Sequence, residues 1–124
     1  MNPGEIALAE LQQADGRLKA RPVVVLSVMP PFSDYLVCAL SSKLHRACAD
    51  FDKVIAVGDD DFVTSGLKVG SLIRLGMVAT IPASAILGQL GSISEGRLRR
   101  LRSRLARHIE AEQGASGDGE KPSS

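Results

Sequence analysis

The sequence predicts a mainly β domain: a small, strongly bent antiparallel sheet or barrel closed by one C-terminal α-helix. Several short aliphatic or β-branched runs follow one another at close spacing, separated by turns rich in Gly, Pro and Asp. One long segment with helical apolar spacing comes after them. Strands do not alternate with helices, so a doubly wound α/β fold is not expected.

Length and composition agree with one globular domain. The chain has 124 residues, of which 44% are hydrophobic and 23% charged, as in ordinary soluble proteins. No apolar run approaches the roughly 20 residues of a membrane span, and no signal peptide is seen at the N-terminus. We therefore expect a cytoplasmic protein with no membrane contact.

The first two strands are expected at residues 5–11 and 23–27. The second is a β-branched run that should be buried on both faces. Asp15-Gly16 marks the turn between them. Pro22 fits the first position of the second strand, where a missing N–H is tolerated.

Further strands are expected at residues 35–40, 53–57, 71–75 and 77–81, with a last edge strand at 86–93. Gly76 separates the strands at 71–75 and 77–81, and Pro82 ends the latter. The acidic turn at 59–61 precedes a single helical turn, which Asp61 is expected to cap.

The C-terminal helix is expected to begin after the N-cap Ser94 and to end near residues 113–114. Its apolar stripe comprises Leu98, Leu101, Leu105 and Ile109. Residues 113–124 are rich in Gly, Ser and charge, which predicts a disordered acidic tail. The folded domain is thus expected to span residues 1–112.

The net charge of +1 is unevenly distributed. Residues 93–110 carry 6 Arg and 2 Glu, a net charge of +4, and residues 111–124 carry a net −2. One helix face presents Arg97, Arg100, Arg104 and Arg107. Such a stripe is often only a solvated face, but it also suits an RNA backbone, an acidic partner or the acidic tail itself.

Two cysteines do not make a disulfide framework, so free thiols are expected. Cys38, His45 and Cys48 match no common zinc spacing. The aspartates at 59–61 are better explained by capping than by binding a divalent ion. We expect neither a metal nor another cofactor.

The order of the segments resembles that of the MazF/PemK family of toxin endoribonucleases from bacterial type II toxin–antitoxin pairs. The resemblance covers about residues 4–109. It rests on Gly4-Glu5-Ile6, Arg21-Pro22-Val23-Val24-Val25-Leu26-Ser27, Cys38-Ala39-Leu40-Ser41-Ser42, Gly66-Leu67-Lys68, Ile73-Arg74-Leu75, Ala79-Thr80-Ile81 and Leu90-Gly91-Ser92-Ile93-Ser94. The Arg-Pro entry into the second strand is the most telling part.

The resemblance implies a small SH3-like barrel of the MazF/CcdB type, usually a homodimer, that cuts single-stranded RNA at short sequences without a metal. It implies neutralisation by an acidic antitoxin that covers the RNA groove. Arg21 matches the arginine that acts at the scissile phosphate, Ser41 a position near that phosphate, and Arg74 a third functional position. An arginine suits a phosphate clamp because it is always charged and binds two oxygens at once.

Other residues are expected around these three. RNA contacts are expected from Lys19, Ser42, Lys43 and Phe32, the last being the one aromatic residue placed to stack on a base. His45 is a candidate general base. The alternatives without a function in RNA binding are a salt bridge for Arg21, a turn residue for Ser41 and an exposed loop histidine for His45.

Two features depart from the family pattern. Some members carry an acidic general base two places after the equivalent of Arg74, where this chain has Gly76. The loop before Arg21 is also short and lacks the histidine that some members hold there. The alternative hypothesis is therefore a catalytically impaired protein of this fold that binds an antitoxin, or a protein target such as DNA gyrase, without cutting RNA. A module unrelated to toxins is a further alternative, because fold does not fix function.

Overall fold

The computed structural model describes residues 1–46 and 51–116. Its six strands form one antiparallel sheet in the spatial order β4-β5-β3-β2-β1-β6. The elements in chain order are β1 (Glu5–Gln12), β2 (Leu18–Met29), β3 (Asp34–Ser41), the 3₁₀ turn η1 (Leu44–Arg46), β4 (Lys53–Ile55), α1 (Phe62–Ser65), β5 (Ser71–Ile81), the 3₁₀ turn η2 (Ala83–Ala85), β6 (Ile86–Ser92) and α2 (Glu95–Ser116).

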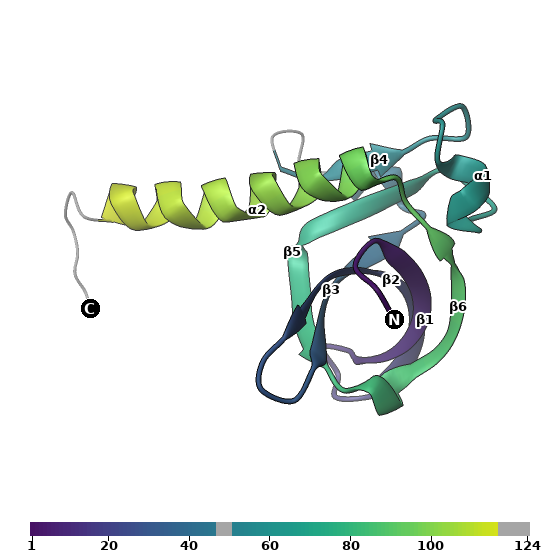
Figure 1. Ribbon diagram of the computed structural model, residues 1–124, viewed down its shortest axis with the longest axis horizontal. Coiled ribbons are helices and arrows are strands. Elements are labelled where there is room, and N and C mark those ends of the chain that lie inside the picture. Colours follow the sequence, from purple (N-terminus) through teal and green to yellow (C-terminus); the bar gives the residue numbers. More distant parts are fainter. Residues whose placement is uncertain (47–50, 117–124) are drawn as a thin grey trace.

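The sheet curls strongly upon itself, and α2 lies across one side of it (Figure 1). This confirms the predicted bent antiparallel sheet with a C-terminal helix. The sheet is not closed, however, because the edge strands β4 and β6 do not pair in the described part of the chain. None of the described helices is long and apolar enough to cross a membrane.

The two strands predicted at 71–75 and 77–81 are one long strand, β5. Its pairing with β3 shifts abruptly: Ala39 lies opposite Arg74, whereas the preceding Cys38 lies opposite Val78. Gly76, which suggested a break, therefore lies in an irregularity of one continuous strand. Glycine is common at such irregularities within a sheet.

Pro22 does not begin β2, which starts four residues earlier at Leu18. The ring lies opposite Leu8 of β1, and the pairing of β2 with β3 begins only at Val23. At Pro22 the strand is therefore paired on one side alone, so a missing N–H is tolerated there.

Buried residues line both faces of the sheet, as predicted for the run at 23–27. Val24 and Leu26 belong to a core cluster that includes Leu101 of α2, whereas Val23 and Val25 belong to a second cluster. Cys38 lies in the first cluster and is fully buried. Burial, together with the charge of Asp52, raises the pKa of the Cys38 thiol to about 12.

The short helix α1 packs backbone to backbone against β6. Gly66 ends α1 in the left-handed conformation, with a φ of 75°, and a side chain there would overlap the carbonyl of Leu90. A side chain at Gly91 would likewise overlap the carbonyl oxygen of Thr64. Both glycines are therefore required by this close approach.

The N-terminus of α2 is capped as predicted, because Ser94 Oγ accepts a hydrogen bond of 3.1 Å from the Arg97 N–H. Leu98, Leu101 and Leu105 pack onto the body, but Ile109 is 57% exposed. The reason is visible in Figure 1: α2 continues well past the edge of the sheet. It ends at Ser116, and residues 117–124 of the predicted tail lie outside the described residues.

Asp61 does not cap α1 with its side chain, contrary to the prediction. Its carboxylate instead accepts hydrogen bonds from the Ser94 N–H at 3.0 Å and the Arg97 Nε at 2.8 Å. Arg97 also pairs with Asp59 at 2.8 Å. Burial alone would raise the pKa of Asp61, but the hydrogen bonds from Arg97 and Ser94 keep that pKa below its ordinary value.

The Asp61–Arg97 ion pair is expected to make the free energy of unfolding fall at low pH. Because the pKa of Asp61 is lowered by folding, its contribution is present above the unfolded value of about 3.9 and is lost as the pH falls through the lower folded value. We expect Asp61→Asn to lower the free energy of unfolding at pH 7 by about 2 kcal/mol. Urea titrations across pH 2–7 should show a shallower acid loss in the variant; parallel curves would contradict this.

Candidate functional site

A cavity of about 630 Å³ opens where the β1–β2 turn, the end of β3 and the start of β5 meet. It brings together six of the residues that the sequence singled out: Lys19, Arg21, Ser41, Ser42, Lys43 and Arg74. It also contains residues that the sequence analysis did not select, chiefly Gln13 and Lys68.

The sheet register explains why residues so far apart in the chain meet. Val23 lies opposite Ala39, and Ala39 lies opposite Arg74 on its other side. Arg21 lies two residues before Val23, and Ser41 lies two residues after Ala39. Because β2 and β3 are antiparallel, both side chains point to the same face at the same end of the sheet. The three predicted catalytic residues thus come from three neighbouring strands, β2, β3 and β5.

The cavity is strongly cationic. Its positive side chains are Lys19, Arg21, Lys43, Lys68 and Arg74. No Asp, Glu or His among the described residues lines it. Positive charges gathered in a hollow without counter-charges raise the local concentration of anions. We name this feature the cationic cavity.

Gln13 holds the side chain of Arg21. Its Oε1 accepts a hydrogen bond of 3.2 Å from Arg21 Nε, and its Nε2 donates one of 3.1 Å to the carbonyl of Leu11. These two bonds leave the terminal nitrogens of Arg21 for another acceptor. The sequence offered no signal for Gln13 beyond its place in a polar turn.

No described acidic side chain forms an ion pair with Arg74. Its Nε is buried and has no hydrogen-bond partner among the described residues. A buried donor that is left unpaired costs about 1–3 kcal/mol. The guanidinium is thus an uncompensated positive group in the wall of the cationic cavity.

Ser41 ends β3 and faces the cationic cavity. Its Oγ accepts a hydrogen bond of 3.1 Å from the Lys43 N–H, as expected of a turn residue. A hydroxyl that accepts in this way still has its own hydrogen to donate. Ser41 therefore fits both readings, a local turn bond and a donor towards a ligand.

Two predicted residues lie elsewhere. Phe32 is 83% exposed in the β2–β3 turn, so the length of β3 separates it from Ser41. His45 is exposed in η1 and does not line the cationic cavity. Gly76 is also not in the lining, since a Cβ there would point to the ring of Phe51 at 3.7 Å.

The alternative sites weighed in the sequence gain no support from geometry. Within residues 1–46 and 51–116, no three His, Cys, Asp or Glu side chains are grouped so that they could hold a metal ion. Cys48 lies outside the described residues. The aspartates at 59 and 61 are engaged with Arg97.

Comparison with known proteins places this fold among bacterial toxins. The model of the PemK-like, MazF-like toxins of type II toxin–antitoxin systems matches residues 2–109, so the chain belongs to that family. Among solved structures it is similar to the Mycobacterium tuberculosis toxin MazF-mt6, with a TM-score of 0.63 and 19% sequence identity, covering 86% of this chain and 96% of that one. No curated protein matches the chain.

Proposed function

We propose that this toxin is a metal-independent, sequence-specific endoribonuclease that binds single-stranded RNA in the cationic cavity. The observation that carries the proposal is a cavity lined by five cations, with no Asp, Glu or His among its described lining residues. Phosphate oxygens supply what this arrangement lacks, namely negative charge and hydrogen-bond acceptors. Membership of a family whose members are typically endoribonucleases supports the same reading.

RNA cleavage requires a proton to be removed from the attacking hydroxyl, a proton to be donated to the leaving oxygen, and negative charge to be neutralised at the phosphate. The 2′-hydroxyl oxygen attacks the adjacent phosphorus, the bond to the 5′ oxygen breaks, and a 2′,3′-cyclic phosphate and a 5′-hydroxyl end result. Arg21 and Arg74 neutralise the phosphate as charge builds on its oxygens, and the Ser41 hydroxyl donates to one of them.

The described part of the site has no evident side chain for proton transfer. An arginine is a poor acid or base near neutral pH, and the described lining contains no Asp, Glu or His. We propose that water accepts the proton of the 2′-hydroxyl and returns one to the 5′ oxygen. The enzyme would then be slow, with a rate that rises with pH.

The same proposal extends to partners and location. The cationic cavity suits an acidic segment of a cognate antitoxin, which would compete with RNA for the same positive charges. We propose that the toxin acts in the cytoplasm as a homodimer and inhibits growth by cutting messenger RNA.

Replacing Arg21 by Ala is expected to lower RNA cleavage about 10³-fold, because one of two phosphate clamps is lost. A long single-stranded RNA is incubated with the parent or the variant in excess chelator, and the 5′ ends of the fragments are mapped. We expect discrete cuts by the parent that the variant does not make. The fold should be retained, since among the described residues the substitution removes a single side-chain hydrogen bond, to Gln13. Full activity of the variant would overturn this site.

One observation favours the alternative of a binding protein that does not cut: no titratable base lines the described part of the cationic cavity. In that case the same assay would leave RNA intact with folded parent protein. Tight binding of an acidic antitoxin, weakened by Arg21→Ala, would then establish the cavity as a protein-binding site.

A further inference from the structure

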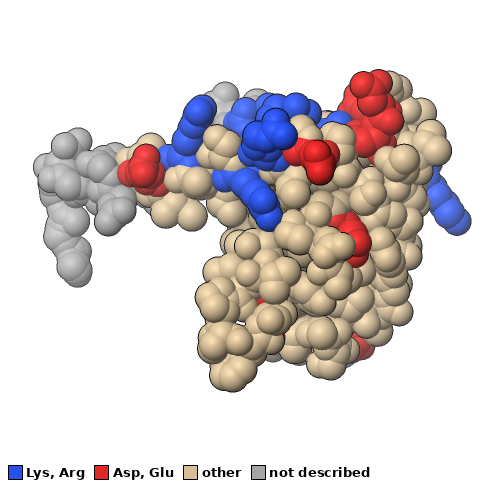
Figure 2. Space-filling view, in the orientation of Figure 1, with Lys and Arg blue, Asp and Glu red and all other residues tan. Residues whose placement is uncertain are grey.

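A second groove runs along α2, on the side of the molecule where Lys and Arg side chains gather (Figure 2). It has a volume of about 660 Å³. Its walls are α2 and the segment that leads into β4. The residues that line it are Phe51, Lys53, Arg99, Arg100, Ser103, Arg104, Arg107 and His108. We name it the α2 groove.

The α2 groove is rich in positive side chains. Five of its eight lining residues are Lys or Arg, and none of the described ones is an Asp or Glu. Arg100, Arg104 and Arg107 are spaced along the helix by about 6 Å and 4.5 Å, from a rise of 1.5 Å per residue. Arg97 pairs with Asp59 and Asp61 and lies outside the groove. The positive charge along this face is therefore concentrated where the groove is.

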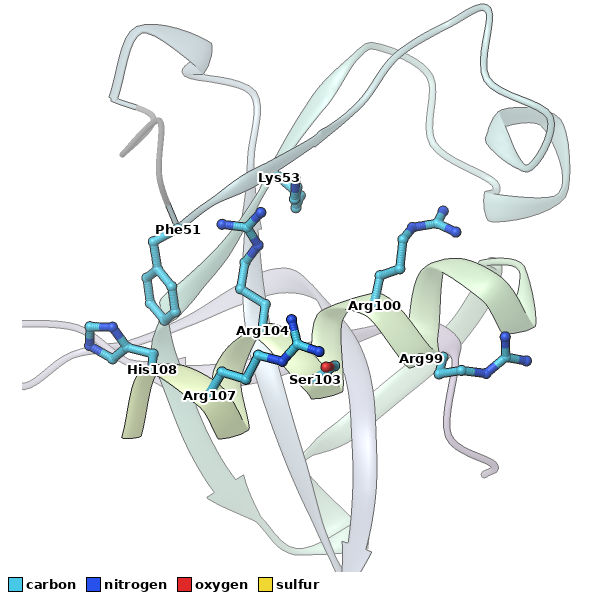
Figure 3. Close-up of a pocket in the computed structure, with 8 residues that line it drawn as sticks. All are labelled: Phe51, Lys53, Arg99, Arg100, Ser103, Arg104, Arg107 and His108. Carbon is cyan, nitrogen blue, oxygen red and sulfur yellow. The ribbon is translucent and has the colours of Figure 1, made fainter. Parts of the chain in front are cut away.

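One end of the α2 groove carries two rings. Phe51 and His108 pack with their centroids 4.5 Å apart and a tilt of 35° (Figure 3). Phe51 is half-buried and His108 is exposed. A row of cations that ends in aromatic faces is the arrangement with which proteins hold single-stranded nucleic acids, where cations track phosphates and rings stack on bases.

The α2 groove and the cationic cavity lie on two sides of the same stretch of β5. Gly76 is exposed, and its missing side chain would touch the ring of Phe51. The next residue, Met77, lines the cationic cavity. The two sites are therefore neighbours at residues 76–77 of β5, and Gly76 adds no side chain between them.

We propose that the α2 groove is a second binding site for single-stranded RNA, which holds the sugar–phosphate backbone of the strand after it leaves the cationic cavity across Gly76. This inference rests on the proposed function in its choice of ligand. The exposed ring of His108 and the nearness of the cationic cavity favour RNA over an acidic peptide, which would use the arginines but not the ring. The groove gives affinity that grows with RNA length and does not depend on sequence.

The test compares RNA of two lengths, about 6 and about 30 nucleotides, made with 2′-O-methyl groups so that it cannot be cut. Binding is measured by fluorescence anisotropy over a range of salt. The variant is Arg100→Gln with Arg107→Gln. We expect it to bind the long RNA about tenfold more weakly than the parent does, with a salt slope smaller by about 1.4. Binding of the short RNA should be unchanged.

The matched control is Arg17→Glu, which removes the same two units of charge from an exposed residue of the β1–β2 turn that lines neither site. It should keep the parent's gain in affinity with RNA length. Arg21→Ala should weaken the short RNA and keep the gain with length. An unchanged affinity of the double variant for long RNA, or an equal loss in Arg17→Glu, would overturn the proposal.

Cleavage of an unmodified short RNA separates this inference from the proposed function. If the parent does not cut it, the endoribonuclease proposal fails, while the length dependence of binding still decides the α2 groove. If a polyglutamate peptide binds at the groove arginines and long RNA does not, the groove is a protein-docking site and the RNA proposal is wrong.

Discussion

Replacing Arg74 by Met is expected to lower RNA cleavage about 10³-fold without destabilising the protein. The loss of activity follows from removing one of the two arginines that neutralise the phosphate. Stability should be kept, or rise by about 1 kcal/mol, because the variant removes a buried Nε that has no partner. Methionine keeps much of the apolar stem of the arginine side chain.

This combination distinguishes a ligand-binding arginine from a structural one. Cleavage is measured on a short RNA that contains the mapped site, and the free energy of unfolding by urea denaturation. Should the parent not cut RNA, affinity for the 2′-O-methyl RNA replaces the rate as the readout. A structural arginine would lower stability when replaced, so a destabilised variant with parental activity would refute the assignment of Arg74.

The second large effect concerns the fold. Gly91→Ala is expected to lower the free energy of unfolding by about 3 kcal/mol, because its methyl group would overlap the carbonyl oxygen of Thr64 in α1. The overlap cannot be relieved by rotating a side chain, because the methyl group would meet backbone atoms. For a chain of 124 residues such a loss lowers Tm by about 10 °C.

Gly88→Ala is the matched control on the same strand. A Cβ at Gly88 meets nothing within 4 Å, and β6 is exposed there. Its Tm should stay within about 2 °C of the parent, as for most surface changes. Equal losses in the two variants would show that β6 tolerates no side chain for a reason other than contact with α1.

Much of the fold was predictable because apolar runs and turn residues act locally. The strand at 23–27 was recognised as buried on both faces from its β-branched residues, and the structure places alternate residues in two clusters. Ser94 was recognised as a cap from its place before the helix. These features depend on a few neighbouring residues.

The wrong predictions depended on partners distant in the sequence. Gly76 reads as a break, and only the pairing with β3 makes β5 one strand. Asp61 reads as a cap for α1, and only the position of α2 shows that its carboxylate is taken by Arg97. The exposure of Ile109 depends on where the sheet ends beneath α2, which no pattern within the helix reveals.

The candidate site divides in the same way. The family resemblance selected Arg21, Ser41 and Arg74, and the sheet register brings all three to one cavity. Lys68 and Gln13 were missed because each is an ordinary loop residue until the fold carries it to the lining. Phe32 was selected for its ring, and the long β3 carries it away.

The buried thiol of Cys38 allows the rate at which this sheet opens locally to be measured. Only a thiolate reacts with an alkylating reagent, and burial, which raises the pKa of Cys38, also keeps the reagent away from it. In a Cys48→Ser background, alkylation of Cys38 therefore has to wait for β3 to separate from β2 or β5. The alkylation rate then reports how often β3, the strand that carries Ser41, opens. A ligand bound across β2, β3 and β5 would lower that rate.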